Sequence, residues 1–153
     1  MSTLTDSGAA PAPRKIDQLL AHYEESHRDP RNERIHFVAI PLIMVSLLGL
    51  LSAIHPWVAY AFVLASLVYY ARLSLVWLAT MTVVSAVALA LVHAMGERAL
   101  TISIAVFIVA WIAQFVGHKI EGRKPSFFED LQYLWIGPIF VLSKLFLKLG
   151  IRW

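Results

Sequence analysis

The chain of 153 residues contains no cysteine. Disulfide bonds, thiolate metal sites and cysteine nucleophiles are therefore excluded, and any bound metal must use nitrogen or oxygen ligands. Charge is also scarce, because 15% of the residues are charged, where a soluble domain has about 25%. The sequence has no glycine-rich phosphate loop and no serine in a glycine elbow, so nucleotide binding and serine-nucleophile catalysis find no support.

Apolar residues are abundant instead. They make up 59% of the chain, and its mean hydropathy is +0.68. Such a chain has too little polar surface to stay dissolved, and its length suits one domain, since a domain usually takes roughly 100 to 200 residues. We therefore predict an all-α integral membrane protein, with residues 1–14 as a disordered tail and residues 15–153 as a single membrane-embedded domain.

Four apolar runs predict about four transmembrane helices. Crossing the hydrocarbon core of roughly 30 Å takes about 20 residues, and the second of these runs is short. Asp29 and Pro30 form a helix-start signal before the first run, because Asp accepts a backbone N–H and proline at the first position needs no donor. The predicted spans are residues 35–54, 57–70, 73–94 and 100–117.

Two further helices are expected outside these spans. An amphipathic helix over residues 15–26, on the bilayer surface or packed on the protein, is predicted by apolar positions at i, i+3, i+4 and i+7: Ile16, Leu19, Leu20 and Tyr23. Ser126 and Glu129 form a capping box before the last apolar segment, which Gly137 and Pro138 interrupt. We expect this segment to be an interfacial or re-entrant helix pair rather than a fifth span.

Basic residues lie at the ends of apolar runs rather than in one stripe, so we interpret them as membrane anchors and expect no nucleic-acid partner. Four spans place the N-terminal region, Arg72 and the C-terminal region on one side, and Arg98 alone on the other. The positive-inside rule then puts both termini in the cytoplasm, at a bacterial inner membrane or a eukaryotic endoplasmic reticulum. Tryptophans are interpreted as lipid-facing or interfacial anchors: Trp57, Trp77, Trp111 and Trp135.

The same topology sorts the six histidines by depth. His27, His36 and His118 fall at the cytoplasmic ends of spans, whereas His55 and His93 fall roughly 30 Å away at the far ends. The two far histidines are expected to make ordinary interfacial hydrogen bonds. His22 lies on the amphipathic helix and receives no role.

Polar residues near the cytoplasmic histidines share helix faces. Asn32 precedes His36 by four residues, and the second face carries residues spaced i, i+4 and i+7: Gln114, His118 and Glu121. Polar groups on a membrane helix cost free energy unless they face a polar cavity, so they indicate a functional site. Three neutral imidazoles without sulfur suit Fe(II), Zn or Mn, and three protein ligands leave coordination positions open.

Two motifs and a closing segment carry a resemblance to a known family. They are His27-Arg-Asp-Pro-Arg-Asn-Glu-Arg-Ile-His36 with the following Pro41, Gln114-Phe-Val-Gly-His118 with Glu121 and Pro125, and Gly137-Pro138-Ile-Phe140 with Lys144-Leu-Phe-Leu-Lys-Leu-Gly150. In these segments the chain resembles the 2-hydroxy fatty acid dioxygenases, the family typified by the yeast enzyme of phytosphingosine breakdown. The resemblance covers most of the chain beyond the tail.

The resemblance implies Fe(II)-dependent α-oxidation, in which a long-chain 2-hydroxy fatty acid reacts with dioxygen and loses its carboxyl carbon. It implies iron-related, catalytic roles for His27, His36 and His118. Candidates for contacts to these ligands or to the substrate are Asn32, Gln114, Glu121, Arg31 and Arg123, the two arginines through attraction of the carboxylate. Three alternatives remain open: another membrane metal-dependent lipid hydroxylase or desaturase, a small membrane scaffold, and a metal transporter.

Overall fold

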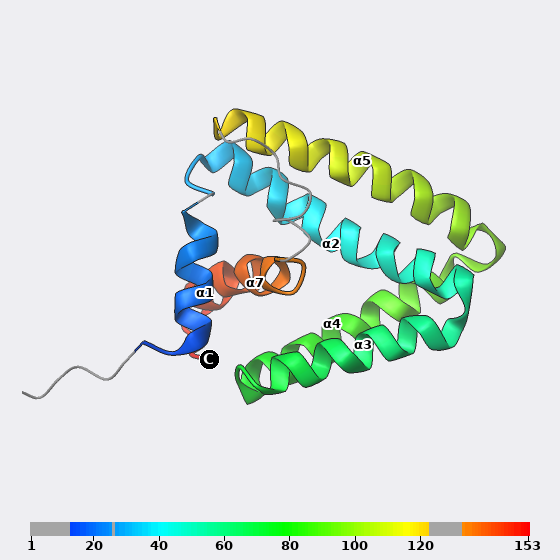
Figure 1. The fold of residues 1–153 in the computed structure, drawn as a ribbon, viewed down its shortest axis with the longest axis horizontal. Coiled ribbons are helices and arrows are strands. Elements are labelled where there is room, and N and C mark those ends of the chain that lie inside the picture. Colours follow the sequence, from blue (N-terminus) through cyan, green and yellow to red (C-terminus); the bar gives the residue numbers. More distant parts are fainter. Residues whose placement is uncertain (1–12, 26, 123–132) are drawn as a thin grey trace, which may run out of the picture.

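The computed structural model describes residues 13–25, 27–122 and 133–153, and in these ranges every regular element is a helix (Figure 1). The predicted all-α class is confirmed for this part of the chain. Most of the predicted N-terminal tail and the capping box of Ser126 and Glu129 lie outside it. The elements are α1 (Lys15–Glu24), α2 (Pro30–Ile54), α3 (Pro56–Ala71), α4 (Leu75–Ala94), η1 (Gly96–Arg98), α5 (Ala99–Ile120) and α7 (Ile136–Leu149).

Three of these segments are long and apolar enough to cross a membrane. They are α2, α4 and the stretch Gly96–Ile120, which consists of η1 and α5. The apolar helix α3 has 16 residues, a rise of about 24 Å, and is shorter than the roughly 30 Å hydrocarbon core. The four predicted spans therefore correspond to three helices of sufficient length and one shorter helix. The sidedness of the membrane stays a prediction.

Local capping chemistry sets several helix ends. The Asp29 side chain accepts a hydrogen bond of 2.8 Å from the backbone N–H of Arg31, which confirms the predicted start of α2. His55 ends α2 and caps α3, because its ring nitrogen accepts from the N–H two residues later. The predicted third span began at residue 73, but Ser74 caps α4 and delays the helix to Leu75.

The helices form two pairs that meet at one end and diverge at the other. In Figure 1, α2 runs beside α5, and α3 runs beside α4. The pairs meet at the turn between α2 and α3 and separate toward the other end, where α1 and α7 lie. The contact between α2 and α5 is the most extensive in the described part of the chain. The pair α2 and α5 therefore forms the frame of the structure. Helix α7 lies at the end where the two pairs diverge, which is the open end of the frame.

Helix α1 packs on α7. This agrees with one of the two positions predicted for it, which were the bilayer surface and the rest of the protein. Its Ile16 and Tyr23 are buried, and Tyr23 joins an apolar cluster with Ile136 and Phe140. Gly137 and Pro138 lie in the first turn of α7, where a missing proline N–H removes no intrahelical bond. In the described residues this dipeptide begins a helix. The first half of the predicted interfacial pair falls within residues 123–132 and lies outside the described ranges.

Two tryptophans contradict their sequence interpretation. Trp77 is fully buried and Trp111 is 9% exposed, so the expectation that both face lipid or the interface is wrong. The Trp77 ring stacks on Phe146 of α7, with ring centroids 5.1 Å apart. Trp57 is 71% exposed and agrees with the expectation. The folding back of α7 over α4, which a helix pattern does not reveal, explains the burial of Trp77.

Gly49 allows α2 and α5 to approach closely at the end remote from α7. A Cβ atom at this position would lie 1.9 Å from Ser103 Oγ and 2.9 Å from Ser103 Cβ. Both distances are below normal contact, and Ser103 itself is buried. A side chain at residue 49 therefore forces the two helices apart.

We expect Gly49→Ala to lower Tm by roughly 2–12 °C, since overpacking costs about 1–3 kcal/mol and 1 kcal/mol shifts Tm by about 2–4 °C at this size. Thermal unfolding of the purified protein in detergent measures the change. The double variant Gly49→Ala with Ser103→Gly is expected to recover most of the loss, because the second change removes the obstructing side chain. A single variant as stable as the unaltered protein would contradict this close approach.

Candidate metal centre

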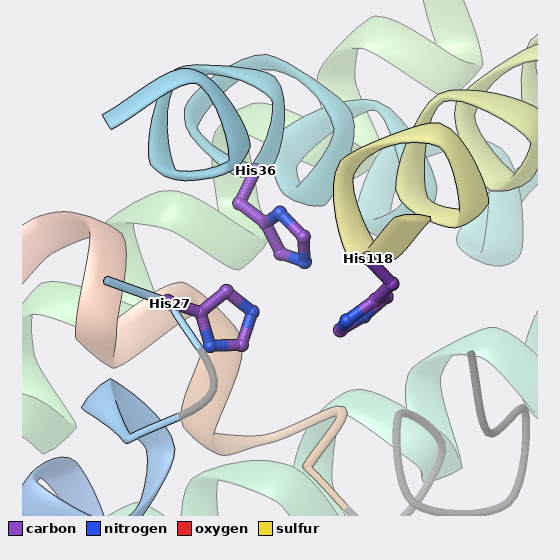
Figure 2. A group of neighbouring side chains, drawn as sticks. All are labelled: His27, His36 and His118. Atoms are coloured by element: carbon purple, nitrogen blue, oxygen red, sulfur yellow. The ribbon is translucent and has the colours of Figure 1, made fainter. Parts of the chain in front are cut away.

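Three histidines from three parts of the chain meet at the open end of the frame. His27 lies between α1 and α2, His36 lies in the second turn of α2, and His118 lies near the end of α5. Their rings face a common space in Figure 2, and each offers a nitrogen within 4.8 Å of the other two. All three side chains are buried, with exposed fractions of 4%, 0% and 6%. The predicted convergence of these histidines is thus present in the fold.

Backbone carbonyls fix the orientation of two of the rings. His27 Nδ1–H donates to the Tyr23 carbonyl at 2.8 Å, and His36 Nδ1–H donates to the Asn32 carbonyl at 3.0 Å. A carbonyl oxygen only accepts, so Nδ1 holds the proton and Nε2 of the neutral ring holds the lone pair. Metal-ligating histidines commonly show this arrangement. The Nε2 atom of His36 is buried and has no hydrogen-bond partner among the described residues.

Aromatic side chains from α1 and α7 form one wall of the cluster. The Tyr23 ring stacks on His27 with centroids 4.1 Å apart and an interplanar angle of 8°, and the Phe140 centroid lies 5.6 Å from that of His27. Sequence reasoning gave Tyr23 only a place on an apolar helix face. The position of Tyr23 four residues before His27 could have indicated that the two side chains lie close together. The contact of Phe140 with His27 depends on the path of α7 and has no such signal.

Glu121 joins the end of α5 to the beginning of α2. Its Oε1 accepts from the backbone N–H of Arg28 at 2.8 Å, and its Oε2 accepts from the N–H of Asp29 at 2.9 Å. The Asn32 amide donates to the same Oε2 at 3.1 Å. Burial opposes ionisation of this carboxyl, but the two backbone donors and the Asn32 amide hold the pKa of Glu121 below its usual value. Glu121, which was predicted to lie near the histidines, therefore links the end of α5 to the start of α2.

Gly117 lets Asn32 fit between α2 and α5. Asn32 is fully buried, and a Cβ atom at Gly117 would lie 2.3 Å from its Oδ1 and 3.4 Å from Cε1 of His36. A methyl group at residue 117 would displace the Asn32 side chain. It would thereby disturb the Asn32 backbone carbonyl, which accepts the hydrogen bond from the His36 ring. Sequence reasoning assigned no role to Gly117, although it directly precedes His118.

The other residues predicted to contact the ligands or the substrate differ in how deeply they are buried. Gln114 lies one turn before His118 and is 5% exposed, and its Oε1 has no hydrogen-bond partner within the described ranges. The Arg31 side chain is 69% exposed and forms an ion pair of 3.0 Å with Asp29. Arg123 lies outside the described residues. Gln114 therefore belongs to the buried cluster, whereas Arg31 lies on its outer rim.

The other histidines lie apart from this cluster. His55 and His93 are exposed at the end of the frame where α2 meets α3, and exposed His22 approaches Glu25 at 3.6 Å. Within residues 13–25, 27–122 and 133–153, the trio is the one group of three or more His, Asp or Glu residues placed to share a metal ion. The predicted separation of near and far histidines is confirmed.

Glu121→Gln is expected to lower Tm at pH 7 by roughly 3–8 °C, because one charged acceptor becomes a donor that faces N–H groups. The lowered pKa of Glu121 means that its ionised form stabilises the fold above pH 4.5 and that this stabilisation is lost as pH falls below that value. Thermal unfolding at pH 7 and pH 4 should therefore show a smaller difference at pH 4. Glu97→Gln, in η1 at the other end, serves as the control, and equal effects from both substitutions would contradict the link between α5 and α2.

Comparison with known proteins places the whole helical domain in one group. The profile of the family described as "2-hydroxy-palmitic acid dioxygenase Mpo1-like" matches residues 14–149. A 2-hydroxy-palmitic acid dioxygenase of Saccharomyces cerevisiae is 27% identical over 138 residues, which covers 86% of this chain and 79% of the yeast protein. No solved structure matches at a significant level. With nearly its whole length inside the profile, the chain belongs to the Mpo1-like family.

Proposed function

We propose that this protein is a membrane dioxygenase that α-oxidises 2-hydroxy fatty acids and shortens them by one carbon. The buried cluster of His27, His36 and His118 is the observation that supports this proposal most, together with membership of the Mpo1-like family. Reaction of one acid with one dioxygen molecule balances if the carboxyl carbon leaves as carbon dioxide, together with one water. The product is then a carboxylic acid with one carbon fewer.

The donor set fits Fe(II). Three neutral imidazoles without sulfur are suitable ligands. The buried Nε2 of His36, which has no hydrogen-bond partner among the described residues, needs an electrophile to replace its lost hydration. The three nitrogens lie within 4.8 Å, while two nitrogens on one ion with bonds of roughly 2.1 Å lie at most about 4.2 Å apart. Small movements of the rings would therefore bring all three nitrogens within bonding distance of one ion. Fe(II) held there would supply the redox chemistry that activates dioxygen.

The protein supplies orientation and exclusion of water. The Tyr23 and Asn32 carbonyls hold the His27 and His36 rings in the tautomer that presents Nε2. Tyr23 and Phe140 cover one side of the cluster with aromatic surface. These contacts keep the ligands in position before substrate binds, which reduces the reorganisation that the reaction requires.

Gln114 and two arginines are proposed to receive the acid headgroup. The Gln114 Oε1 is a buried acceptor that the substrate hydroxyl can satisfy. Arg31, exposed at the rim, provides positive charge that attracts a carboxylate arriving along the membrane surface, and Arg123 is proposed for the same role. We place this site at the cytoplasmic headgroup boundary, where the acid group and its alkyl tail meet different environments.

We expect His36→Ala and His118→Ala each to abolish iron binding and dioxygen consumption with a long-chain 2-hydroxy acid, since each removes one of three ligands. Metal analysis of the purified protein and an oxygen electrode measure the two effects. His55→Ala and His93→Ala are the matched controls, because both histidines are exposed at the other end of the frame.

Comparable losses at all four positions would contradict the assignment of the site. Full turnover without bound iron would contradict the choice of metal. Metal binding by the trio without dioxygen consumption, whatever the acid supplied, would favour a metal-transport function instead.

Gly117→Ala is expected to weaken iron binding roughly 10- to 100-fold, because displacement of Asn32 disturbs the carbonyl that orients His36. Competition with a calibrated chelator measures the iron affinity. Gly49→Ala is the control, since it also disturbs the contact between α2 and α5 but at the remote end. Equal affinity in both variants would contradict a role for Gly117 in holding the ligand.

A further inference from the structure

A large apolar cavity lies beside the histidine cluster. It has a volume of about 330 Å³ and lies between α2, α4 and α7, with Met44, Val84 and Leu142 among its lining residues. All of the residues that line it are apolar. Val83 and Val87 on its α4 side are 64% and 55% exposed, so the cavity opens toward the surrounding bilayer.

The near end of the cavity lies one helical turn from the cluster. Ile40 lines the cavity and follows His36 by four residues on α2. On α7, Pro138 lines it two residues before Phe140, whose ring contacts that of His27. Toward the far end the lining includes Ala88, which belongs to the same apolar cluster as Leu48 of α2. That level is about 18 Å along α2 from His36.

A second, small cavity shares part of its lining with the large one. It has a volume of about 30 Å³, and Tyr23 and Gln114 line it beside the histidines. Three further lining residues also line the large cavity: Ile40, Met44 and Pro138. Gly137 lies at this junction, where a Cβ atom would come within 3.1 Å of Ile40 Cδ1. The lack of a side chain at Gly137 therefore leaves space in the small cavity between Tyr23 and Ile40.

We propose that the cavity between α2, α4 and α7 holds the alkyl tail of the acid while its carboxyl and hydroxyl groups lie at the histidines. This inference rests on the proposed function and adds Val84 and Val87 as residues that determine how tail length affects turnover. A cavity of about 150 Å³ accommodates benzene, so 330 Å³ has room for roughly a dozen carbons.

The two ends of this space match the two ends of one amphiphile. The Gln114 Oε1 and the His36 Nε2 are buried polar atoms that have no hydrogen-bond partner in the described ranges, and both lie at the cluster end. Beyond Ile40 the lining is apolar. A single fatty acid satisfies both environments, whereas a phospholipid would bring a bulky headgroup to a cluster whose histidines are at most 6% exposed.

Photo-crosslinking locates the tail directly. The full-length protein in detergent is irradiated with 2-hydroxyhexadecanoic acid that carries a diazirine midway along its tail, and labelled peptides are mapped by mass spectrometry. We expect labels on Val83–Leu91 of α4 or on α7, and excess unmodified acid should suppress them. Labels confined to the exposed surfaces of α3 and α5 would overturn the inference, as would labelling of the cavity that phospholipid suppresses and the acid does not.

Substitutions that fill the cavity provide an independent measurement. Val84→Phe and Val87→Phe should lower kcat/KM for 2-hydroxyhexadecanoic acid by roughly tenfold or more, as expected for overpacking against a bound tail. Val87→Phe should leave kcat/KM for 2-hydroxyoctanoic acid within about twofold, because the tail of this acid ends near Met44, about 12 Å along α2 from His36 and before the level of Val87. Val109→Phe is the matched control, since Val109 is 63% exposed on α5 and does not line the cavity.

The outcomes separate this inference from the proposed function. Unaltered protein that turns over both acids, with variants that keep the same ratio between them, would overturn the tail site and leave the proposed function standing. Unaltered protein that turns over neither acid, but still shows acid-suppressed labels on α4, would overturn the proposed function and leave the tail site standing.

Discussion

The close contact between α2 and α5 is the constraint on which the rest of this structure depends. Glycines allow it at both ends, with Ser103 facing Gly49 and Asn32 facing Gly117. Glu121 then ties the last turn of α5 to the backbone at the start of α2. Because His36 and His118 belong to these two helices, their separation is determined by this contact. His27 joins them through the connection that Glu121 holds.

Helix α7 has a double function in this arrangement. Its Phe140 contributes to the aromatic wall beside His27, while Pro138 and Leu142 close the apolar cavity. The same helix therefore borders a polar cluster on one side and an apolar space on the other. This division suits a substrate whose reacting head needs fixed polar partners and whose tail needs none.

Local signals predicted much of the fold, and tertiary contacts determined the rest. The Asp29 cap and the turn at His55 were predictable because capping depends on neighbouring residues. The meeting of the three histidines followed from sorting residues by depth. The burial of Trp77 was not predictable, because α4 is apolar all round and its sequence does not distinguish a packed face from a lipid-facing one. The role of Gly117 likewise depends on which residue α2 places opposite it.

We propose that the three imidazoles form one iron site. A crystal structure of the Fe(II)-loaded protein, with anomalous scattering recorded at the iron edge, would locate the metal. We expect one strong anomalous peak between the rings of His27, His36 and His118, within bonding distance of all three. Iron bound at other side chains, with the three rings uncoordinated, would contradict it.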